Sequence, residues 1–225
     1  MGSLPRKVHI FSNVILFSVL MTMSYLFVDD HLAFCTQDIR DTFYIPLRIL
    51  SIIISPATQL FIWATVFVWL LLIKKSEKFC FILYPMIASL ILTNALVRVI
   101  KVVFGRSRPD IFLTSGIYHL KMISFQRIFS SLPSGHAATI AAIMGFLAAR
   151  YPRQAILFIS LSVVISLCRV LIGAHYLSDV LVGNFLGLYV SWIIYFQERI
   201  REPAYLDYTR RECVWKTHVT SKGKL

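Results

Sequence analysis

The chain has 225 residues, of which 57% are hydrophobic and only 15% are charged. A soluble domain of this size carries a more charged surface, so the composition excludes an ordinary soluble protein and indicates a polytopic membrane protein. The formal net charge of +12 suits a protein that faces anionic lipid or holds an anionic substrate. Nucleic acid is not an expected partner, because the basic residues are dispersed between apolar segments and form no continuous stripe.

The first apolar run, residues 8–28, follows Arg6 and Lys7 and is about 20 residues long, the length of a membrane-spanning helix. No cleavage site of small residues follows the run, so we interpret it as a retained span and not as a signal peptide. Further apolar runs predict five more spans. The six predicted spans are 8–28, 52–73, 79–100, 136–151, 154–173 and 177–197.

This pattern predicts an all-α fold, a bundle of six transmembrane helices in a single integral-membrane domain over residues 1–225, with a basic tail from about 198. The fourth span is short for a full crossing. Pro56 and Pro85 are expected to kink the second and third helices or to mark their ends. The four cysteines show no paired or metal-type spacing, so we expect no disulfide framework.

Charge outside the apolar runs predicts the orientation. Basic residues gather on one side of the predicted spans, whereas Asp29, Asp30, Asp38 and Asp41 open the other side. The basic set comprises Arg6, Lys7, Lys74, Lys75, Lys78, Arg150, Arg153, Arg199, Arg201, Arg210 and Arg211. The positive-inside rule then places both termini in the cytoplasm.

Three short polar blocks stand where apolar runs meet predicted loops. They are KVVFGRSRP (101–109), PSGH (133–136) and RVLIGAHYLSD (169–179). In the predicted orientation all three lie on the outer face, where their cations break the positive-inside rule, and this indicates a functional site. At about 1.5 Å per helical residue, Arg153 and Arg169 are separated by roughly 24 Å of a hydrocarbon core about 30 Å thick. The site is therefore expected near the level of lipid phosphates.

The first two blocks contain residue types that bind anions. Lys101 and Arg108 are seven residues apart, on one helix face, although a basic cluster that reaches lipid headgroups would look the same. Ser134 is a good N-cap, and Gly135 lets a helix N-terminus approach an anion closely. His136 follows in the first turn of the helix.

The third block pairs a histidine with a carboxylate. His175 and Asp179 are four residues apart, so the carboxylate can reach one ring nitrogen, fix the tautomer and leave the other nitrogen as a better nucleophile. Arg169 offers a bidentate fork for phosphate. A purely structural His–Asp pair is the commoner reading of such a pair alone, but ionisable groups inside apolar segments are costly and usually functional.

Taken together, the blocks resemble the type 2 phosphatidic acid phosphatase (PAP2) superfamily, whose pattern is K-x6-RP, then PSGH, then SR-x5-H-x3-D. The chain shows Lys101-x6-Arg108-Pro109, Pro133 to His136, and Arg169-x5-His175-x3-Asp179. The resemblance covers residues 80–195. Cys168 stands where the family usually has Ser, a residue that we interpret as a supporting one.

The resemblance implies a role for each site residue. His175 would attack phosphorus and form a phosphohistidine, Asp179 would orient it, and His136 would protonate the leaving oxygen and later help to activate water. The remaining groups would stabilise the equatorial oxygens. They are Lys101, Arg108, Ser134, Gly135 and Arg169. Arg106 is expected to add charge at the rim, and neither a metal nor another cofactor is expected.

These roles predict a lipid phosphate or diphosphate phosphatase, a multi-pass protein of the cell inner membrane acting at the periplasmic face. The expected partners are the bilayer and a lipid phosphate: an isoprenyl diphosphate, phosphatidylglycerol phosphate, phosphatidic acid or a lipid A phosphate. The loop 110–131 is expected to lie in the interface and help to admit the lipid. A lumen-facing dolichyl diphosphate phosphatase and a phosphotransferase that uses the same phosphohistidine remain alternatives. A proton-coupled transporter is less favoured, because the polar residues gather at one face. The sequence leaves the lipid and the oligomeric state open.

Overall fold

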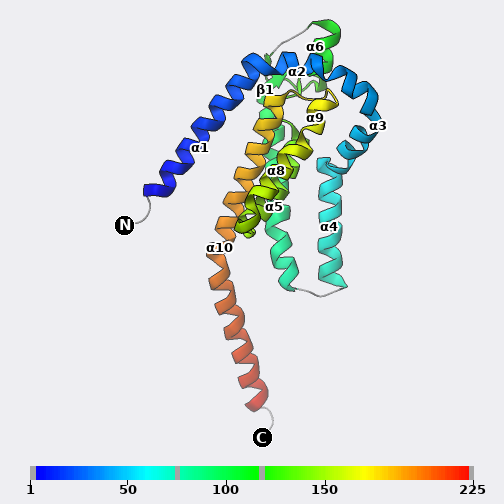
Figure 1. The fold of residues 1–225 in the computed structure, drawn as a ribbon. Coiled ribbons are helices and arrows are strands. Elements are labelled where there is room, and N and C mark those ends of the chain that lie inside the picture. The colour runs from blue at the N-terminus through cyan, green and yellow to red at the C-terminus, as the bar shows by residue number, and fades with distance from the viewer. Residues whose placement is uncertain (1–3, 74–76, 117–119, 223–225) are drawn as a thin grey trace.

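The computed structural model describes residues 4–73, 77–116 and 120–222, which form a helical bundle with one small two-stranded sheet (Figure 1). The elements in chain order are α1 (Leu4–Met23), the π-helix η1 (Ser24–Val28), α2 (Asp29–Cys35), α3 (Gln37–Ile53), α4 (Pro56–Leu72), α5 (Glu77–Val103), β1 (Phe104–Arg106), α6 (Pro109–Ser115), β2 (Leu120–Met122), the 3-10 turn η2 (Arg127–Phe129), α7 (Gly135–Arg150), the 3-10 turn η3 (Pro152–Gln154), α8 (Ala155–Ser166), α9 (Cys168–Leu171) and α10 (Leu177–Lys222).

Within the described ranges, four segments are long and apolar enough to cross a membrane. They are Val14–Cys35, Ile82–Val103, Pro152–Leu171 and Leu177–Arg199. Gln37–Ile53 and Pro56–Leu72 pass the same test as a pair bent by 46°, which would make a fifth. The prediction of a polytopic helical membrane protein is confirmed, whereas six spans and the side of each terminus stay predictions.

The α7 helix explains the difference in number. With 16 residues it is about 24 Å long, shorter than the hydrocarbon core of about 30 Å. It packs against α10, α8 and α5, and Ala137, Ala138, Ala141 and Ala142 are fully buried. Neighbouring helices therefore cover it, and it does not need the length of a lipid-exposed span.

Small residues bring α10 into close contact with α7. A Cβ atom at Gly183 would lie 2.5 Å from the Ser134 carbonyl oxygen, and one at Gly187 would lie 2.7 Å from the Ala141 Cβ. Such spacing of small residues lets helix backbones approach closely in membranes. The contact at Gly183 places the start of α7 against the first turns of α10.

Residues 29–51, expected to lie largely outside the predicted spans, are helical in the structure. The α2 and α3 helices arch over one end of the bundle and join α1 to α4 (Figure 1). Charged and apolar residues alternate through α3 in an amphipathic pattern, so no continuous apolar run marked it. Pro56 is the first residue of α4, capped by Ser55, and so marks a helix start as expected, whereas Pro85 lies inside α5.

The chain leaves α5 through β1, which pairs antiparallel with β2, Gly105 opposite Lys121. The loop that follows β2 exposes large apolar side chains, with Ile123 70% and Phe125 85% exposed. Tyr118 and His119, expected to belong to this loop, lie outside the described residues, as do Lys74 and Lys75 of the basic set. At the other end of the chain, α10 continues as one helix to Lys222, so the predicted tail is helical over its described part.

Candidate active site

The three polar blocks meet at one end of the bundle. Lys101 lies in the last turn of α5, Arg108 precedes α6, Ser134 caps α7, and His175 lies in the turn between α9 and α10. Backbone hydrogen bonds join these segments: the Ser134 N–H donates to the Asp179 carbonyl oxygen over 3.0 Å, and the His175 N–H donates to the Arg169 carbonyl oxygen over 3.2 Å. The structure thus places all eight predicted site residues in one region, while their roles stay predictions.

His175 faces Asp179, as the spacing predicts. The His175 Nδ1 lies 3.8 Å from the Asp179 Oδ2, and both side chains are buried. Burial lowers the pKa of His175 to about 3; Asp179 opposes this shift, and the charges of Lys101 and Arg169 reinforce it. The imidazole is therefore neutral near pH 7. With Nδ1 turned toward the carboxylate, Nε2 is the nitrogen left for a substrate.

The Asp179 carboxylate is held from several sides. Its Oδ2 accepts hydrogen bonds from the Ser131 hydroxyl over 2.5 Å and from the Tyr176 N–H over 3.1 Å. Its Oδ1 accepts from Arg106 Nη1 over 2.7 Å. A carboxylate with three donors stays ionised and fixed in place, which suits an orienting group.

Three cations surround the histidines. The Lys101 ammonium donates to the carbonyl oxygens of Ser130 and Ser131. Arg108 Nη2 donates to the Ser130 hydroxyl over 3.2 Å, and burial lowers the pKa of this guanidinium. Arg169 is 7% exposed and donates to the Ser51 hydroxyl of α3. Arg108 and Arg169 thus keep only part of their donor capacity engaged in these bonds.

Some polar atoms of the site are left without partners. In the part of the chain that the structure describes, the Nε atoms of Arg108 and Arg169 and the Nδ1 of His175 are buried with no hydrogen bond. Buried groups of this kind are rare and call for an explanation. Two unpartnered arginine N–H groups beside a neutral histidine suit a site that receives an anion.

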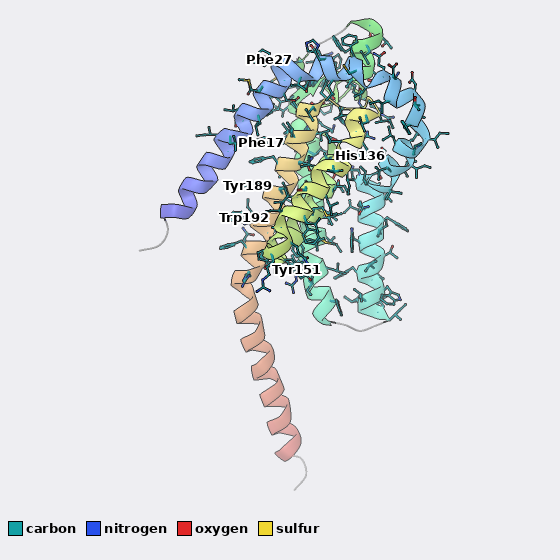
Figure 2. The ribbon with its side chains drawn as sticks, in the orientation of Figure 1. Phe17, Phe27, His136, Tyr151, Tyr189 and Trp192 are labelled. Carbon is teal, nitrogen blue, oxygen red and sulfur yellow. The ribbon has the colours of Figure 1, made fainter. Side chains whose placement is uncertain are left out.

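The start of α7 has the expected cap. Ser134 adopts an extended backbone conformation, and its hydroxyl accepts from the Ala137 N–H over 3.5 Å. His136 follows in the first turn, partly buried, at the site end of the bundle (Figure 2). The charges of Arg169, Lys101 and Arg108 act on it, and His175 lies within the same electrostatic range. His136 is therefore close enough to these cations and to His175 to interact with them electrostatically.

The expectation for Arg106 was wrong. Its side chain is 1% exposed and does not lie at the rim. Arg106 forms ion pairs with Asp179 over 2.7 Å and with Asp29 over 2.9 Å. The rings of Tyr176 and Tyr25 lie 3.9 and 4.8 Å from its guanidinium carbon. Two carboxylates and two aromatic rings therefore surround this cation inside the protein. The largely apolar sequence around Arg106 gave no sign of these partners.

Asp29 is the residue that the sequence reasoning missed. It is 1% exposed, accepts from the Ser178 N–H over 3.0 Å and from the Ser24 hydroxyl over 3.0 Å, and thereby connects α2 to the start of α10. In the sequence, Asp29 served only as one of the acidic residues that mark the outer side of the membrane. A carboxylate at the end of an apolar run was the available signal, because such residues usually pair inside the protein.

Cys168 belongs to the apolar interior. It is 3% exposed and packs with Ile54 and Ile140. Cys168 and Cys35 are free cysteines among the described side chains. A buried thiol behaves as a small hydrophobic group, so this position contributes packing beneath Arg169 where the family usually has a hydroxyl.

A cap at the start of a buried helix, a His–Asp pair and three cations meet at this candidate site between membrane helices. The chain belongs to the PAP2 superfamily, whose model matches residues 82–202. It is similar to two proteins named lipid A 1-phosphatase, from Rhizobium johnstonii (35% identity) and Rhizobium etli (34% identity), each over 103 residues and 46% of this chain. The match spans 42% and 44% of those two relatives, less than half of their length.

The fold has a solved counterpart. A crystal structure of a transmembrane PAP2 type phosphatidylglycerolphosphate phosphatase from Bacillus subtilis matches with a TM-score of 0.56 at 20% identity. The match covers 84% of this chain and 96% of that one. This likeness is one of fold, and it extends beyond the three motifs to most of the bundle.

Proposed function

We propose that the protein is a metal-independent lipid phosphate phosphatase that works through a phosphohistidine. The observation that carries the proposal is the convergence of a neutral, buried His175, its partner Asp179, and unpartnered arginine groups at one membrane end of the bundle. Membership of the PAP2 superfamily supports the same chemistry.

In the first step, the Nε2 of His175 attacks phosphorus, and the bond to the lipid oxygen breaks. His136 carries a proton from the bound phosphate monoester to that leaving oxygen, so a lipid alcohol departs and a phosphohistidine remains. Asp179 stabilises the positive charge that develops on the His175 ring. In the second step, neutral His136 takes a proton from water, the resulting hydroxide attacks phosphorus, and inorganic phosphate leaves His175.

The charge on the transferred phosphoryl group is met by fixed donors. Lys101, Arg108 and Arg169 supply three cations, and Ser134 and Gly135 supply the N-terminal end of α7. Preorganised donors of this kind contribute most of the catalysis in phosphoryl transfer. Because side chains already supply the cations, we expect activity to persist in the presence of a metal chelator.

The substrate class follows from where the site lies. Asp179 stands in the first turn of α10, which is also a candidate span, so the reacting group lies near the membrane boundary. The loop that carries the exposed Ile123 and Phe125 is bonded to the end of α5, and these side chains suit contact with lipid and entry of a lipid substrate. The names of the relatives favour lipid A 1-phosphate and phosphatidylglycerol phosphate among the candidates. By the charge pattern, the site faces the periplasm from the inner membrane.

The test is phosphate release from a panel of these lipids by the purified protein, with and without chelator. We expect release of inorganic phosphate that vanadate inhibits, complete loss of activity in His175→Ala, and a loss of about 10²–10⁴-fold in His136→Ala. Trapping of acid-labile phosphate on wild-type protein and its absence in His175→Ala would support the intermediate. No turnover of any lipid, or normal turnover in His175→Ala, would contradict the proposal.

A further inference from the structure

An apolar groove of about 870 Å³ lies on the side of the bundle away from the site residues. Its volume falls within the roughly 300–1,000 Å³ of typical ligand pockets. The groove opens between α1 and α10, where α1 leans away from the bundle toward its N-terminus (Figure 1). Phe17, Tyr189 and Trp192 follow this side of the bundle, whereas His136 lies on the opposite side (Figure 2).

The two walls of the groove differ. One wall is a continuous stack of aromatic rings: Phe17 of α1 lies 4.1 Å from Phe185, which is followed along α10 by Tyr189 at 5.8 Å and, beyond it, Trp192 and Phe196. The opposite wall consists mainly of small residues at the end of α7 and the start of α8, among them Ala149 and Ala155. Flat rings facing small side chains leave room for a long, thin apolar chain.

The length of the groove matches one leaflet. Phe185 and Phe196 are eleven residues apart on α10, which corresponds to about 16 Å, and half of a hydrocarbon core is about 15 Å. Phe185 lies six residues, or about 9 Å, inward from Asp179. The groove therefore begins about 9 Å below the level of Asp179, crosses the membrane midplane, and ends about 25 Å below that level, in the distal leaflet.

Arginines stand at the distal end of the groove. Arg150 and Arg153 flank Pro152, which lines it, and Arg199 follows the lining residue Phe196 by one helical turn. Among the described side chains, none of the three arginines has a carboxylate within ion-pair distance. The neighbouring Glu198 accepts from Tyr84 of α5 instead. Basic groups at this level attract anionic headgroups.

We propose that this groove is a binding site for one anionic phospholipid of the distal leaflet. Its acyl chain lies between the aromatic wall and the small residues, and Arg150, Arg153 and Arg199 hold its phosphate. This site is separate from the proposed catalytic one and does not depend on the proposed function, because it would bind an intact lipid that is not hydrolysed.

Native mass spectrometry of the full chain in detergent, titrated with phosphatidylglycerol or phosphatidylcholine of the same acyl composition, tests the proposal. We expect one phosphatidylglycerol to bind at least about tenfold more tightly than phosphatidylcholine, which corresponds to about 1.4 kcal/mol. Ala155→Trp should fill the groove and reduce binding of both lipids. The matched control is Ile156→Trp, an adjacent side chain that is 83% exposed and does not line the groove; it should bind as wild type does.

The double variant Arg150→Gln/Arg153→Gln keeps the groove open and removes two charges. We expect it to lose the preference for phosphatidylglycerol, and Arg150→Lys/Arg153→Lys to retain most of it. Equal affinity of wild type for the two lipids would overturn the proposal, as would unchanged binding in Ala155→Trp. A dimeric mass that excludes lipid would also overturn it, since a second copy would then cover the groove.

Discussion

Arg106 neutralises two buried carboxylates, Asp29 on α2 and Asp179 on α10, with Nη–Oδ distances of 2.9 and 2.7 Å. Two carboxylates and one guanidinium leave one negative charge in this cluster. Lys101, Arg108 and Arg169 lie nearby and outweigh it, so the site as a whole is positively charged. The orientation of Asp179, and through it that of His175, thus depends on the ion pair with Arg106.

We predict that Arg106→Met destabilises the protein by about 3–5 kcal/mol, because removing one partner leaves a buried charge uncompensated. Asp29→Asn should destabilise it less, and a double-mutant cycle should show a coupling energy of about 1–3 kcal/mol. Denaturant unfolding in detergent measures both quantities. Arg98→Met is the matched control, an exposed arginine of α5, and additive effects of Arg106→Met and Asp29→Asn would contradict the cluster.

The protonation of His175 gives a prediction of pH dependence. The pKa of this imidazole falls from an ordinary 6.5 to about 3. As pH drops below 6.5, the unfolded chain takes up a proton that the folded protein does not, so stability falls as the pH is lowered from about 6.5 toward 3. Between pH 6.5 and 5.0 the loss should be about 2 kcal/mol.

His175→Asn should lack this component, because its side chain does not titrate. Unfolding of both proteins at pH 7.5 and pH 5.0 gives the comparison, and parallel losses of stability in the two proteins would contradict a buried neutral imidazole.

At the level of elements, the contact between α7 and α10 sets the geometry of the site. Gly183 faces the carbonyl oxygen of Ser134, and the Ser134 N–H bonds to the Asp179 carbonyl oxygen. The cap of α7 and the carboxylate of α10 are thus fixed relative to each other by backbone contacts. His136, one residue beyond Gly135, depends on the same contacts.

We predict that Gly183→Ala moves the start of α7 away from α10 and lowers kcat strongly, since a displacement of about 1 Å can cost about 10²-fold. The matched control is Gly145→Ala, where a new Cβ would lie 3.0 Å from Leu188 Cα in the same interface, far from the site. The control should lose stability and retain kcat. Equal effects of the two variants on kcat would contradict the positioning role of Gly183.

Elements differ in how far sequence could predict them. The apolar runs of α5, α8 and α10 were visible, and the Ser134 cap was predicted from residue type. The amphipathic α3 was missed because neither its charges nor its apolar residues form a run. Asp29 and Arg106 meet across 77 positions of the chain, and no local pattern encodes such a pairing. Each of the three motifs could be recognised in the sequence because each has its own internal spacing.

The whole molecule has one long helix that extends beyond the bundle. With 46 residues, α10 is about 69 Å long, more than twice the roughly 30 Å of a hydrocarbon core. Its first turn carries Asp179, and Figure 1 shows its far end well beyond the other helices. The far end must therefore stand on the side of the membrane opposite to the site.

This arrangement predicts the outcome of a topology experiment. A fluorescent protein fused after Leu225 should fold and fluoresce in the bacterial cytoplasm, whereas alkaline phosphatase at the same position should be inactive. The positive-inside rule gives the same orientation, through Arg150, Arg153 and Arg199. An active alkaline phosphatase fusion would place the candidate site in the cytoplasm and reverse the proposed orientation.

Two contacts tie the candidate catalytic segment to earlier parts of the chain. They are the hydrogen bond between Arg169 and Ser51 and the ion pair between Arg106 and Asp29. Both partners lie in the first quarter of the chain, outside the family match at 82–202. A graft of that match onto another scaffold would therefore carry every proposed reacting group, but Arg169 would lose Ser51 and Arg106 would lose Asp29. A segment that is to keep its site after transfer to another protein has to include α2 and α3. A chimera built from this chain should therefore place its junction before residue 24 and not at residue 82.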